Sequence, residues 1–336
     1  MTDPWAGPAP PVTIAVLCAD DGDMSRPPSL DDLGPGVDVR HATAATLPGA
    51  LRGADVLFVW DFLSTAVEPA WPAAAGHLRW VHVASAGVDR LLFPGLVAGD
   101  TVLTNSRGVF DRPIAEYVLT LLLAFAKDLP ATLDLQRAGT WRHRETERLD
   151  GREVLIVGTG SIGRATARLL RAVGLRVSGV GRTARPDEPD FGQVHAAERL
   201  HEVLPRADFV VVAAPLTAQT RGMFDAAAFG RMKRSARFVN VGRGALVVEE
   251  DLLVALRSGR LGGAGLDVFA EEPLPPGHPF WQLPQVIVSP HMSGDFVGWL
   301  DALTDLFARN YRRWRQGEAM LNVVDKTLGY VPSPAR

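Results

Sequence analysis

Three charged side chains with the chemistry of an acid, its partner and an anion-binding group lie in the second half of the chain. Arg243 is flanked by two glycines, Glu272 precedes a proline and His291 follows one, and each comes shortly after an apolar run. An arginine binds carboxylates and polarises carbonyls, a histidine donates protons near neutral pH, and a carboxylate beside that histidine keeps it protonated. Together they predict hydride transfer to an oxo acid. Taken singly, each has a simpler explanation, as a surface charge, a loop residue or a solvated turn.

A glycine-rich turn near the middle of the chain links an apolar run to a helical pattern. The turn reads Gly158-Thr159-Gly160-Ser161-Ile162-Gly163. A strand that ends in GxGxxG and leads into a helix is typical of a dinucleotide site. We expect Gly158 to permit the tight turn, Gly160 to let the backbone approach a pyrophosphate, and Gly163 to let the helix lie close to the strand. The N–H groups at the helix start, at Ser161 and Ile162, are expected to face the anion.

The end of the next apolar run bears on which dinucleotide is bound. An NAD site usually has an Asp or Glu here for the ribose 2′-OH. This chain has Arg182 and Thr183, with Arg185 just beyond, and no carboxylate. Because guanidinium pairs with phosphate in bidentate fashion, the turn favours NADP(H) over NAD(H). The simpler alternative is an exposed arginine in a surface turn.

The elements that must position these residues indicate an α/β fold with two domains. The first apolar runs are 12–17, 37–40, 54–60, 80–84 and 101–104, and six further parallel strands are expected at 154–157, 175–180, 208–213, 237–241, 263–268 and 285–289. Helical or turn segments separate the runs, which is the rhythm of a parallel sheet. A doubly wound sheet binds ligands beyond the carboxyl ends of its strands, where Pro215, Arg243, Glu272 and His291 fall.

Two long helices are also predicted. The segment 109–129 has apolar residues at helical spacing, and its part from Leu119 to Phe125 is apolar nearly all round. We expect this helix to be buried, with a partner subunit as one source of cover. The segment 299–316 is predicted to be an amphipathic helix.

The composition excludes several classes of function. The 336 residues suffice for two domains. A net charge of −3 and a pI near 6.3 leave no overall basic field, so no nucleic-acid partner is expected. The one cysteine, Cys18, cannot form an intramolecular disulfide or a multi-cysteine site, and no metal is expected. The first residues lack a signal sequence or a membrane span, which predicts a cytoplasmic protein with no membrane partner.

Further short motifs follow in order along nearly the whole chain. They are 83–89 (VASAGVD), 105–109 (NSRGV), 149–151 (LDG), 215–217 (PLT), 240–244 (NVGRG), 265–269 (GLDVF), 290–291 (PH) and 322–325 (NVVD). In these motifs the chain resembles the D-isomer-specific 2-hydroxyacid dehydrogenase family. The resemblance implies two Rossmann-like domains with the active site in the cleft between them. A smaller, flavodoxin-like substrate domain would comprise 1–106 and 295–336, and a doubly wound dinucleotide-binding domain would comprise 107–294.

The resemblance also implies roles for residues of the dinucleotide-binding half. Arg243 would bind the substrate carboxylate and oxo group, His291 would be the acid/base, and Glu272 would pair with His291. Pro215 is expected among the cofactor-binding residues. Asp267 would contact the nicotinamide amide, and the alternative is that it caps the end of a strand.

For the substrate half, the resemblance implies that the backbone around Ser85, Ala86 and Gly87 holds the substrate carboxylate. Trp60 is a candidate for the wall of the substrate pocket, and the alternative is a core tryptophan. The family usually dimerises through the long helix after the first domain, which predicts a homodimer through the 109–129 region.

Departures within the family narrow the expected activity. Glu272 argues against the formate dehydrogenase branch, which has a glutamine at this place, and the turn 181–183 (GRT) is similar to the NADPH-dependent glyoxylate and hydroxypyruvate reductases. We therefore expect reduction of a small 2-oxo acid, such as glyoxylate or hydroxypyruvate, to a D-2-hydroxy acid. One alternative is an NAD-dependent D-2-hydroxyacid dehydrogenase such as phosphoglycerate dehydrogenase, although no regulatory extension follows Tyr330. Another is a non-catalytic NAD(H)-sensing binding protein.

Overall fold

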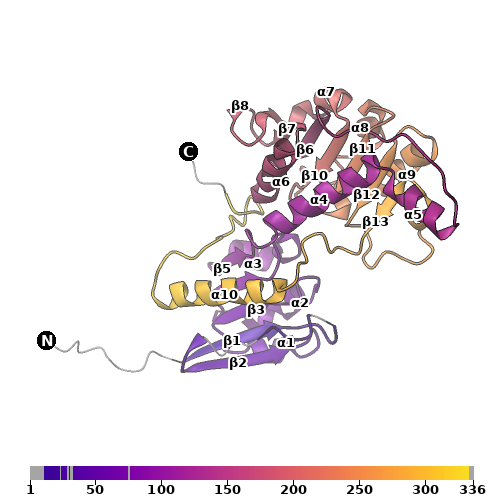
Figure 1. Cartoon of the computed structure of the whole chain (residues 1–336). Helices are drawn as coiled ribbons and strands as arrows, with labels where there is room; N and C mark the ends of the chain where they lie inside the picture. Colours follow the sequence, from indigo (N-terminus) through magenta and orange to yellow (C-terminus); the bar gives the residue numbers. More distant parts are fainter. Residues whose placement is uncertain (1–10, 23, 29, 31–32, 75, 333–336) are drawn as a thin grey trace. The chain divides into compact units, whose positions relative to one another are not determined.

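The computed structural model describes residues 11–22, 24–28, 30, 33–74 and 76–332, which fall into two compact units (Figure 1). One unit joins the two ends of the chain, up to Val109 and from Val297 onward, and the other comprises Phe110–Phe296. The first boundary lies three residues beyond the expected one at 106, and the second lies two residues beyond the expected start at 295. Each unit has its own sheet and its own core.

The smaller unit is built on a five-stranded parallel sheet. Its strands are β1 (Val12–Leu17), β2 (Val37–Ala42), β3 (Val56–Val59), β4 (Trp80–Val83) and β5 (Val102–Asn105). Their order is β2-β1-β3-β4-β5, and all neighbouring pairs are parallel. This is the flavodoxin-like strand order, so the expected fold of this unit is confirmed. The five apolar runs read from the sequence all form strands.

Helices from both ends of the chain cover this sheet. They are α1 (Leu47–Leu51), α2 (Val67–Ala70), α3 (Pro94–Ala98) and α10 (Trp299–Arg315). The C-terminal helix α10 packs on the sheet through Phe307, whose ring stacks on Phe58 of β3 at 4.2 Å and on Trp80 of β4 at 5.1 Å. The helix predicted at 299–316 therefore adds its apolar face to a core built by the other end of the chain.

A completely buried histidine, His82 on β4, belongs to the same core. Its Nδ1 lies 2.7 Å from the Thr104 hydroxyl, which accepts a hydrogen bond from Trp80 Nε1 at 2.8 Å. Its Nε2 lies 3.4 Å from the Ser106 hydroxyl, which donates to the Val83 carbonyl. This arrangement suits a neutral ring with its proton on Nε2. Burial lowers the pKa of His82 from 6.5 to about 3.

We expect the protein to lose stability as the pH falls from 7.5 to 5, and His82→Asn to lessen that loss. Below the ordinary histidine pKa the unfolded chain binds a proton that folded His82 does not bind, so the free energy of unfolding falls by up to about 1.4 kcal/mol per pH unit. Urea unfolding at several pH values measures both slopes. His77→Asn is the control, because His77 is exposed. Equal slopes for wild type and His82→Asn would assign the loss to other groups.

The larger unit is built on an eight-stranded sheet. Its strands are β6 (Glu153–Val157), β7 (Arg176–Gly181), β8 (Arg185–Glu188), β9 (Gly192–Ala196), β10 (Phe209–Val212), β11 (Arg237–Asn240), β12 (Gly263–Leu266) and β13 (Val286–Val288). The order is β13-β12-β11-β10-β6-β7-β9-β8, with only β8 antiparallel to its neighbour. The strand order reverses between β6 and β10, so the predicted doubly wound sheet is confirmed.

The count of six strands was too low, because β8 and β9 were not predicted. The segment Arg185–Glu188 reads Arg-Pro-Asp-Glu, and it forms the outermost strand of the sheet. An edge strand of polar residues has no apolar run to reveal it. In β9 only Val194 is buried. The polar hairpin is therefore an addition that the sequence pattern did not indicate.

The helices of the larger unit flank its sheet. They are α4 (Asp111–Ala126), α5 (Leu129–Arg137), α6 (Ser161–Ala172), α7 (Leu200–Val203), α8 (Ala226–Arg231) and α9 (Glu249–Arg257). The predicted long helix is α4, which packs along α6 and buries seven of its residues. Its burial is not complete, since Leu123 remains 41% exposed. Within the described residues, no helix is long and apolar enough to cross a membrane.

Candidate active site

Arg243 is presented by a tight loop at the carboxyl end of β11. The Asn240 side chain accepts a hydrogen bond from the Gly242 N–H at 3.1 Å and donates one to the Arg243 carbonyl at 3.0 Å. A Cβ added at Gly244 would overlap the backbone carbonyl of Phe269, so glycine is required there. The Arg243 side chain is half-buried. The loop thus fixes the backbone that carries the guanidinium.

His291 and Glu272 are in direct contact, as the sequence predicted. His291 Nδ1 lies 2.9 Å from Glu272 Oε2, and Glu272 Oε1 accepts a hydrogen bond from the Phe269 N–H at 2.9 Å. Because a carboxylate only accepts, the histidine donates from Nδ1 and leaves Nε2 for another partner. Burial raises the pKa of Glu272, but the hydrogen bond and charge of His291, with the nearby charge of Arg243, hold this pKa below its ordinary value. The structure therefore brings the three predicted groups together.

A fully buried carboxylate, Asp267, holds the loop that presents His291. It accepts hydrogen bonds from the Ser289 hydroxyl at 2.6 Å, the Met292 N–H at 2.9 Å and the Ser293 N–H at 3.0 Å. His291 itself has a left-handed backbone, with φ 53°, and its N–H donates to the Asp267 carbonyl. A non-glycine residue in that region costs energy, which the surrounding bonds must offset. Of the two roles considered for Asp267, these contacts support the strand-end cap.

The glycine turn has the shape that a dinucleotide requires. Gly158 has φ 110°, and a Cβ there would lie 2.5 Å from the backbone of Ala213. A Cβ on Gly163 would overlap the Gly158 carbonyl, so the helix lies close to the strand as expected. At Gly160 an added Cβ would meet nothing within 4 Å, and no side chain of the described residues caps α6. Open space and uncapped N–H groups at a helix start suit a bound phosphate.

Three further residues were predicted to bind the cofactor: Ser161 and Ile162 lie within this turn, and Pro215 follows β10. Ser161 and Ile162 open α6, and the Ser161 hydroxyl donates to Asp111 of α4 at 2.9 Å. The Ser161 hydroxyl is thus already hydrogen-bonded within the chain, and a bound anion would contact the Ser161 backbone N–H. Pro215 follows β10 across the switch point, where its carbonyl accepts a hydrogen bond from the Thr220 hydroxyl at 2.7 Å.

The chain after β7 carries two arginines, Arg182 in the turn and Arg185 on β8, and Arg185 contacts the glycine turn. Arg182 and Thr183 are exposed at the strand end. Arg185 is half-buried on β8, and its Nη2 donates to the Thr159 hydroxyl at 2.8 Å. Its Nε is buried and has no hydrogen-bond partner within the described part of the chain. An unsatisfied guanidinium donor is costly, so this site suits an added anion, and the sequence named Arg185 only as a neighbour of the turn.

In the smaller unit, the Ser85–Gly87 loop follows β4 at the carboxyl edge of its sheet. The Ser85 side chain is buried and donates to the Gly87 carbonyl at 2.6 Å, and the Asn105 amide donates to the Ala86 carbonyl at 2.6 Å. These bonds use the carbonyls of the loop as acceptors. The loop is therefore held in shape by side chains of its own unit.

Trp60 directly follows β3 in the same unit. It is completely buried, with its ring edge-on to Phe58 at 5.5 Å and its Nε1 without a hydrogen-bond partner among the described residues. Complete burial supports the alternative that the sequence left open, a core tryptophan. A place for Trp60 in the wall of a substrate pocket stays a prediction.

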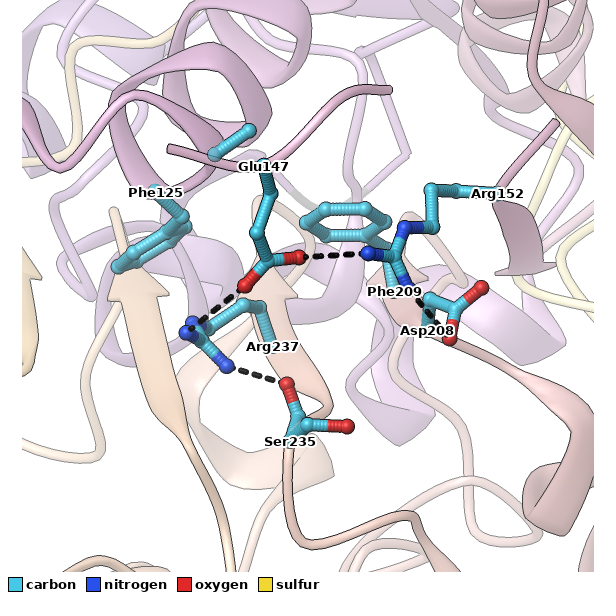
Figure 2. Close-up of a pocket in the computed structure, with 8 residues that line it drawn as sticks. Phe125, Glu147, Arg152, Asp208, Phe209, Ser235 and Arg237 are labelled. Atoms are coloured by element: carbon cyan, nitrogen blue, oxygen red, sulfur yellow. Dashed lines mark hydrogen bonds and ion pairs between the residues drawn. The ribbon is translucent and has the colours of Figure 1, made fainter. Parts of the chain in front are cut away.

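A cavity of about 110 Å³ lies at the opposite edge of the larger sheet (Figure 2). It is found where β6, β10 and β11 begin, whereas ligands of doubly wound sheets bind where the strands end. Glu147 lies between Arg152 at 3.2 Å and Arg237 at 3.9 Å, and Arg152 also reaches Asp208 at 3.9 Å. Its charged groups thus pair with one another. We interpret the cluster as a link between the segment before β6 and the base of the sheet.

Similarity to known proteins agrees with this geometry. Residues 119–293 match the family described as D-isomer specific 2-hydroxyacid dehydrogenase, NAD binding domain. Glyoxylate/hydroxypyruvate reductase A of Serratia proteamaculans is 33% identical over 292 residues, which cover 84% of this chain and 90% of that protein. Glyoxylate reductase/hydroxypyruvate reductase of Mus musculus is 35% identical over 260 residues, covering 74% of this chain and 77% of that one.

A solved structure extends the similarity to the whole fold. It is an NADPH-dependent glyoxylate/hydroxypyruvate reductase from Sinorhizobium meliloti in complex with NADP and sulfate, with a TM-score of 0.80 and 31% identity. The match covers 95% of this chain and 100% of that one. The family match spans more than half of the chain, and relatives above 30% identity cover more than two thirds of it. The chain therefore belongs to the D-isomer-specific 2-hydroxyacid dehydrogenases, a family of NAD(P)-dependent enzymes.

Proposed function

We propose that this protein is an NADPH-dependent reductase that converts small 2-oxo acids, of the glyoxylate or hydroxypyruvate kind, into D-2-hydroxy acids. The observation that carries the proposal is the pairing of His291 Nδ1 with Glu272, which leaves Nε2 available as a proton donor. Arg243 is close enough for its charge to act on Glu272, so a group that binds anions lies beside the acid. The names of the relatives from Serratia, Mus and Sinorhizobium support this class of substrate.

The proposed reaction divides the work among three side chains. When bound, the reduced dinucleotide supplies the hydride for the carbonyl carbon. Arg243 binds the substrate carboxylate and draws negative charge toward the carbonyl oxygen. His291 donates the proton on Nε2 to that oxygen as its charge develops, and Glu272 holds the imidazolium in place beforehand. After the transfer, His291 is neutral and still donates from Nδ1 to Glu272.

We assign the Ser85–Gly87 loop to the substrate as well. A loop held in place by hydrogen bonds to its carbonyls can offer its N–H groups to a carboxylate without reordering. The loop would then select for 2-oxo acids over neutral ketones. The groups named here act on the carboxylate and the carbonyl of the substrate. None of them selects the substituent on the other side of the carbonyl, so several small 2-oxo acids fit the proposal.

The preference for NADPH rests on the turn after β7. The turn lacks a carboxylate, it exposes Arg182 and Thr183, and it leads to Arg185 with its buried, unpartnered Nε. Two guanidinium groups near one strand end can pair with a 2′-phosphate, and the turn has no carboxylate that would repel it. The related structure that holds NADP supports the same assignment.

Arg182→Asp is expected to reverse part of this preference. Loss of a charge-assisted hydrogen bond costs about 1.5–3 kcal/mol, so kcat/KM for NADPH should fall about 10- to 100-fold, while that for NADH is kept or improved. Initial rates with both cofactors at a fixed 2-oxo acid concentration give the ratio. Arg231→Asp makes the same charge change at an exposed position on α8 and should leave the ratio unchanged. An unaltered ratio in Arg182→Asp would exclude Arg182 from cofactor selection.

A substrate panel tests the proposed function itself. Oxidation of NADPH and of NADH is followed at neutral pH with glyoxylate, hydroxypyruvate, pyruvate and larger 2-oxo acids. Faster turnover with NADPH, and with a small 2-oxo acid, is the expected result. Tight dinucleotide binding without turnover of any of these acids would contradict the proposal and favour the sensing alternative.

We also propose that the protein is a homodimer through α4, α5 and the segment that follows. α5 buries none of its residues, and Leu123, Leu129 and Leu133 are 41–45% exposed. Trp141 is completely exposed. Exposed apolar side chains gathered on one segment mark an interaction site, and a second copy offers the same segment by symmetry. Sedimentation should give about twice the chain mass of 36.2 kDa, and Leu133→Glu should lower it.

A further inference from the structure

The β8–β9 hairpin is held to α6 by three arginines. Arg164, Arg168 and Arg171 are four and three residues apart, so they lie on one face of the helix. Arg164 Nη1 binds both Glu188 and Asp190, the latter at 2.9 Å, and Arg168 reaches Asp190 at 3.2 Å. Arg171 donates to two backbone carbonyls of the hairpin turn, at 2.7 and 3.2 Å. One helix face thus holds the whole turn.

The centre of this contact is a buried ion pair. Glu188 is 4% exposed, and its second oxygen accepts hydrogen bonds from the N–H groups of Asp190 and Phe191. Burial raises the pKa of Glu188, but its bonds to Arg164 and to the two N–H groups hold it below the ordinary value. Glu188 is therefore charged at neutral pH. Because removing such charges from water offsets much of their attraction, the pair by itself is weak evidence for added stability. Its bonds to Arg164 and to the two N–H groups do fix the position of the Glu188 carboxylate.

The same short strand carries Arg185 at its other end. β8 comprises only Arg185–Glu188, so the anchored carboxylate and the arginine that contacts Thr159 are three residues apart. The helix that holds Glu188 starts at Ser161, inside the glycine turn that contains Thr159. Both ends of β8 are thus tied to one turn-and-helix element. A shift of the hairpin on α6 would move the Arg185 guanidinium relative to the glycine turn.

We propose that Arg164 and Glu188, together with Asp190, are positioning residues that set the preference for NADPH by holding β8 so that Arg185 stays beside the glycine turn. The inference rests on the proposed use of NADPH. None of the three has to touch the cofactor, because each acts through Arg185. Loss of the contacts of Arg164 with Glu188 and Asp190 should therefore weaken NADPH binding selectively, since NADH has no 2′-phosphate for Arg185 to bind.

Binding titrations of the full chain test this proposal without turnover. The dissociation constants of NADPH and NADH are measured for wild type, Glu188→Gln, Arg185→Met and the double variant. Glutamine keeps the shape and an acceptor oxygen but loses the charge. We expect Glu188→Gln to weaken NADPH binding about five- to tenfold and to leave NADH within twofold, with no further loss in the Arg185→Met background. Glu202→Gln is the matched control, because its pair with Arg199 is exposed.

Each other outcome counts against the proposal in a distinct way. Glu188 does not act through Arg185 if Glu188→Gln weakens NADPH and NADH binding equally or leaves NADPH binding unchanged. The same conclusion follows if Glu188→Gln lowers NADPH affinity as much in the Arg185→Met background as in the wild type. A wild-type protein that binds NADH as tightly as NADPH would overturn the proposed cofactor preference and this inference with it. If Glu188→Gln lacks a cooperative thermal transition, Asp190→Asn replaces it, and an unchanged NADPH-to-NADH ratio in that variant overturns the proposal.

Discussion

His291→Asn is expected to lower kcat for 2-oxo acid reduction by about a hundred- to ten-thousandfold, because it removes the proton donor. Asparagine is the preferred replacement, since it tolerates the left-handed backbone at φ 53° better than alanine does. The bonds from Asp267 to the loop remain, so the backbone around position 291 should keep its shape. The dissociation constant of NADPH should stay near the wild-type value. Steady-state rates and a fluorescence titration measure the two quantities.

His201→Asn on α7 is the control for the loss of a histidine, because His201 is exposed. The control should retain wild-type kcat. Retention of turnover by His291→Asn would refute the role of His291 as the acid. A parallel loss of NADPH binding and of the thermal transition would instead assign His291 a structural role.

Arg243→Ala is expected to reduce kcat/KM for the 2-oxo acid by at least about a thousandfold. The variant loses a charge-assisted bond to the carboxylate and the stabilisation of developing negative charge on the carbonyl oxygen, each of which contributes about 2–4 kcal/mol. Arg243→Lys keeps the charge but not the planar fork, so it should fall between alanine and wild type. Rates at varied 2-oxo acid concentration separate the effects on kcat and KM.

NADPH binding and thermal stability are the controls for Arg243. The surrounding loop is held by Asn240 and by the fit of Gly244 against Phe269, and both of these contacts remain when the guanidinium is removed. Both quantities should therefore change little in Arg243→Ala. Wild-type kcat/KM in the alanine variant would rule out a contact between Arg243 and the substrate.

The sequence indicated the strands well because of how parallel sheets are covered. All eleven runs form strands. Central strands such as β3, β4 and β10 are buried on both faces and therefore contain continuous apolar residues, whereas the edge strand β2 alternates apolar and polar residues. The same rule predicted that groups following these strands meet at one edge, and His291, Glu272 and Arg243 do so. The edge hairpin was not predicted, because β8 is polar and pairs only with β9.

Two residues had alternative roles that the sequence could not separate. Asp267 was expected either at the nicotinamide or as a strand-end cap, and its three hydrogen bonds to the next loop support the cap. Trp60 was expected in a pocket wall or in the core, and its complete burial supports the core. The choice for Asp267 depends on contacts with residues 22 to 26 positions away along the chain, and the choice for Trp60 depends on burial that only the folded core provides.

The sequence by itself determined the parts of this protein whose chemistry is local. A strand, a glycine turn and a helix start are contiguous in the sequence, so Gly158, Gly160 and Gly163 predict an anion site without any tertiary information. Only the tertiary structure decided which residues lie beside the glycine turn and hold the strand next to it. Arg164 and Glu188 are 24 residues apart and Arg185 and Thr159 are 26 apart, on different elements. Charged pairs carry no periodic signal in the sequence, because their interaction depends on the distance that folding sets between them.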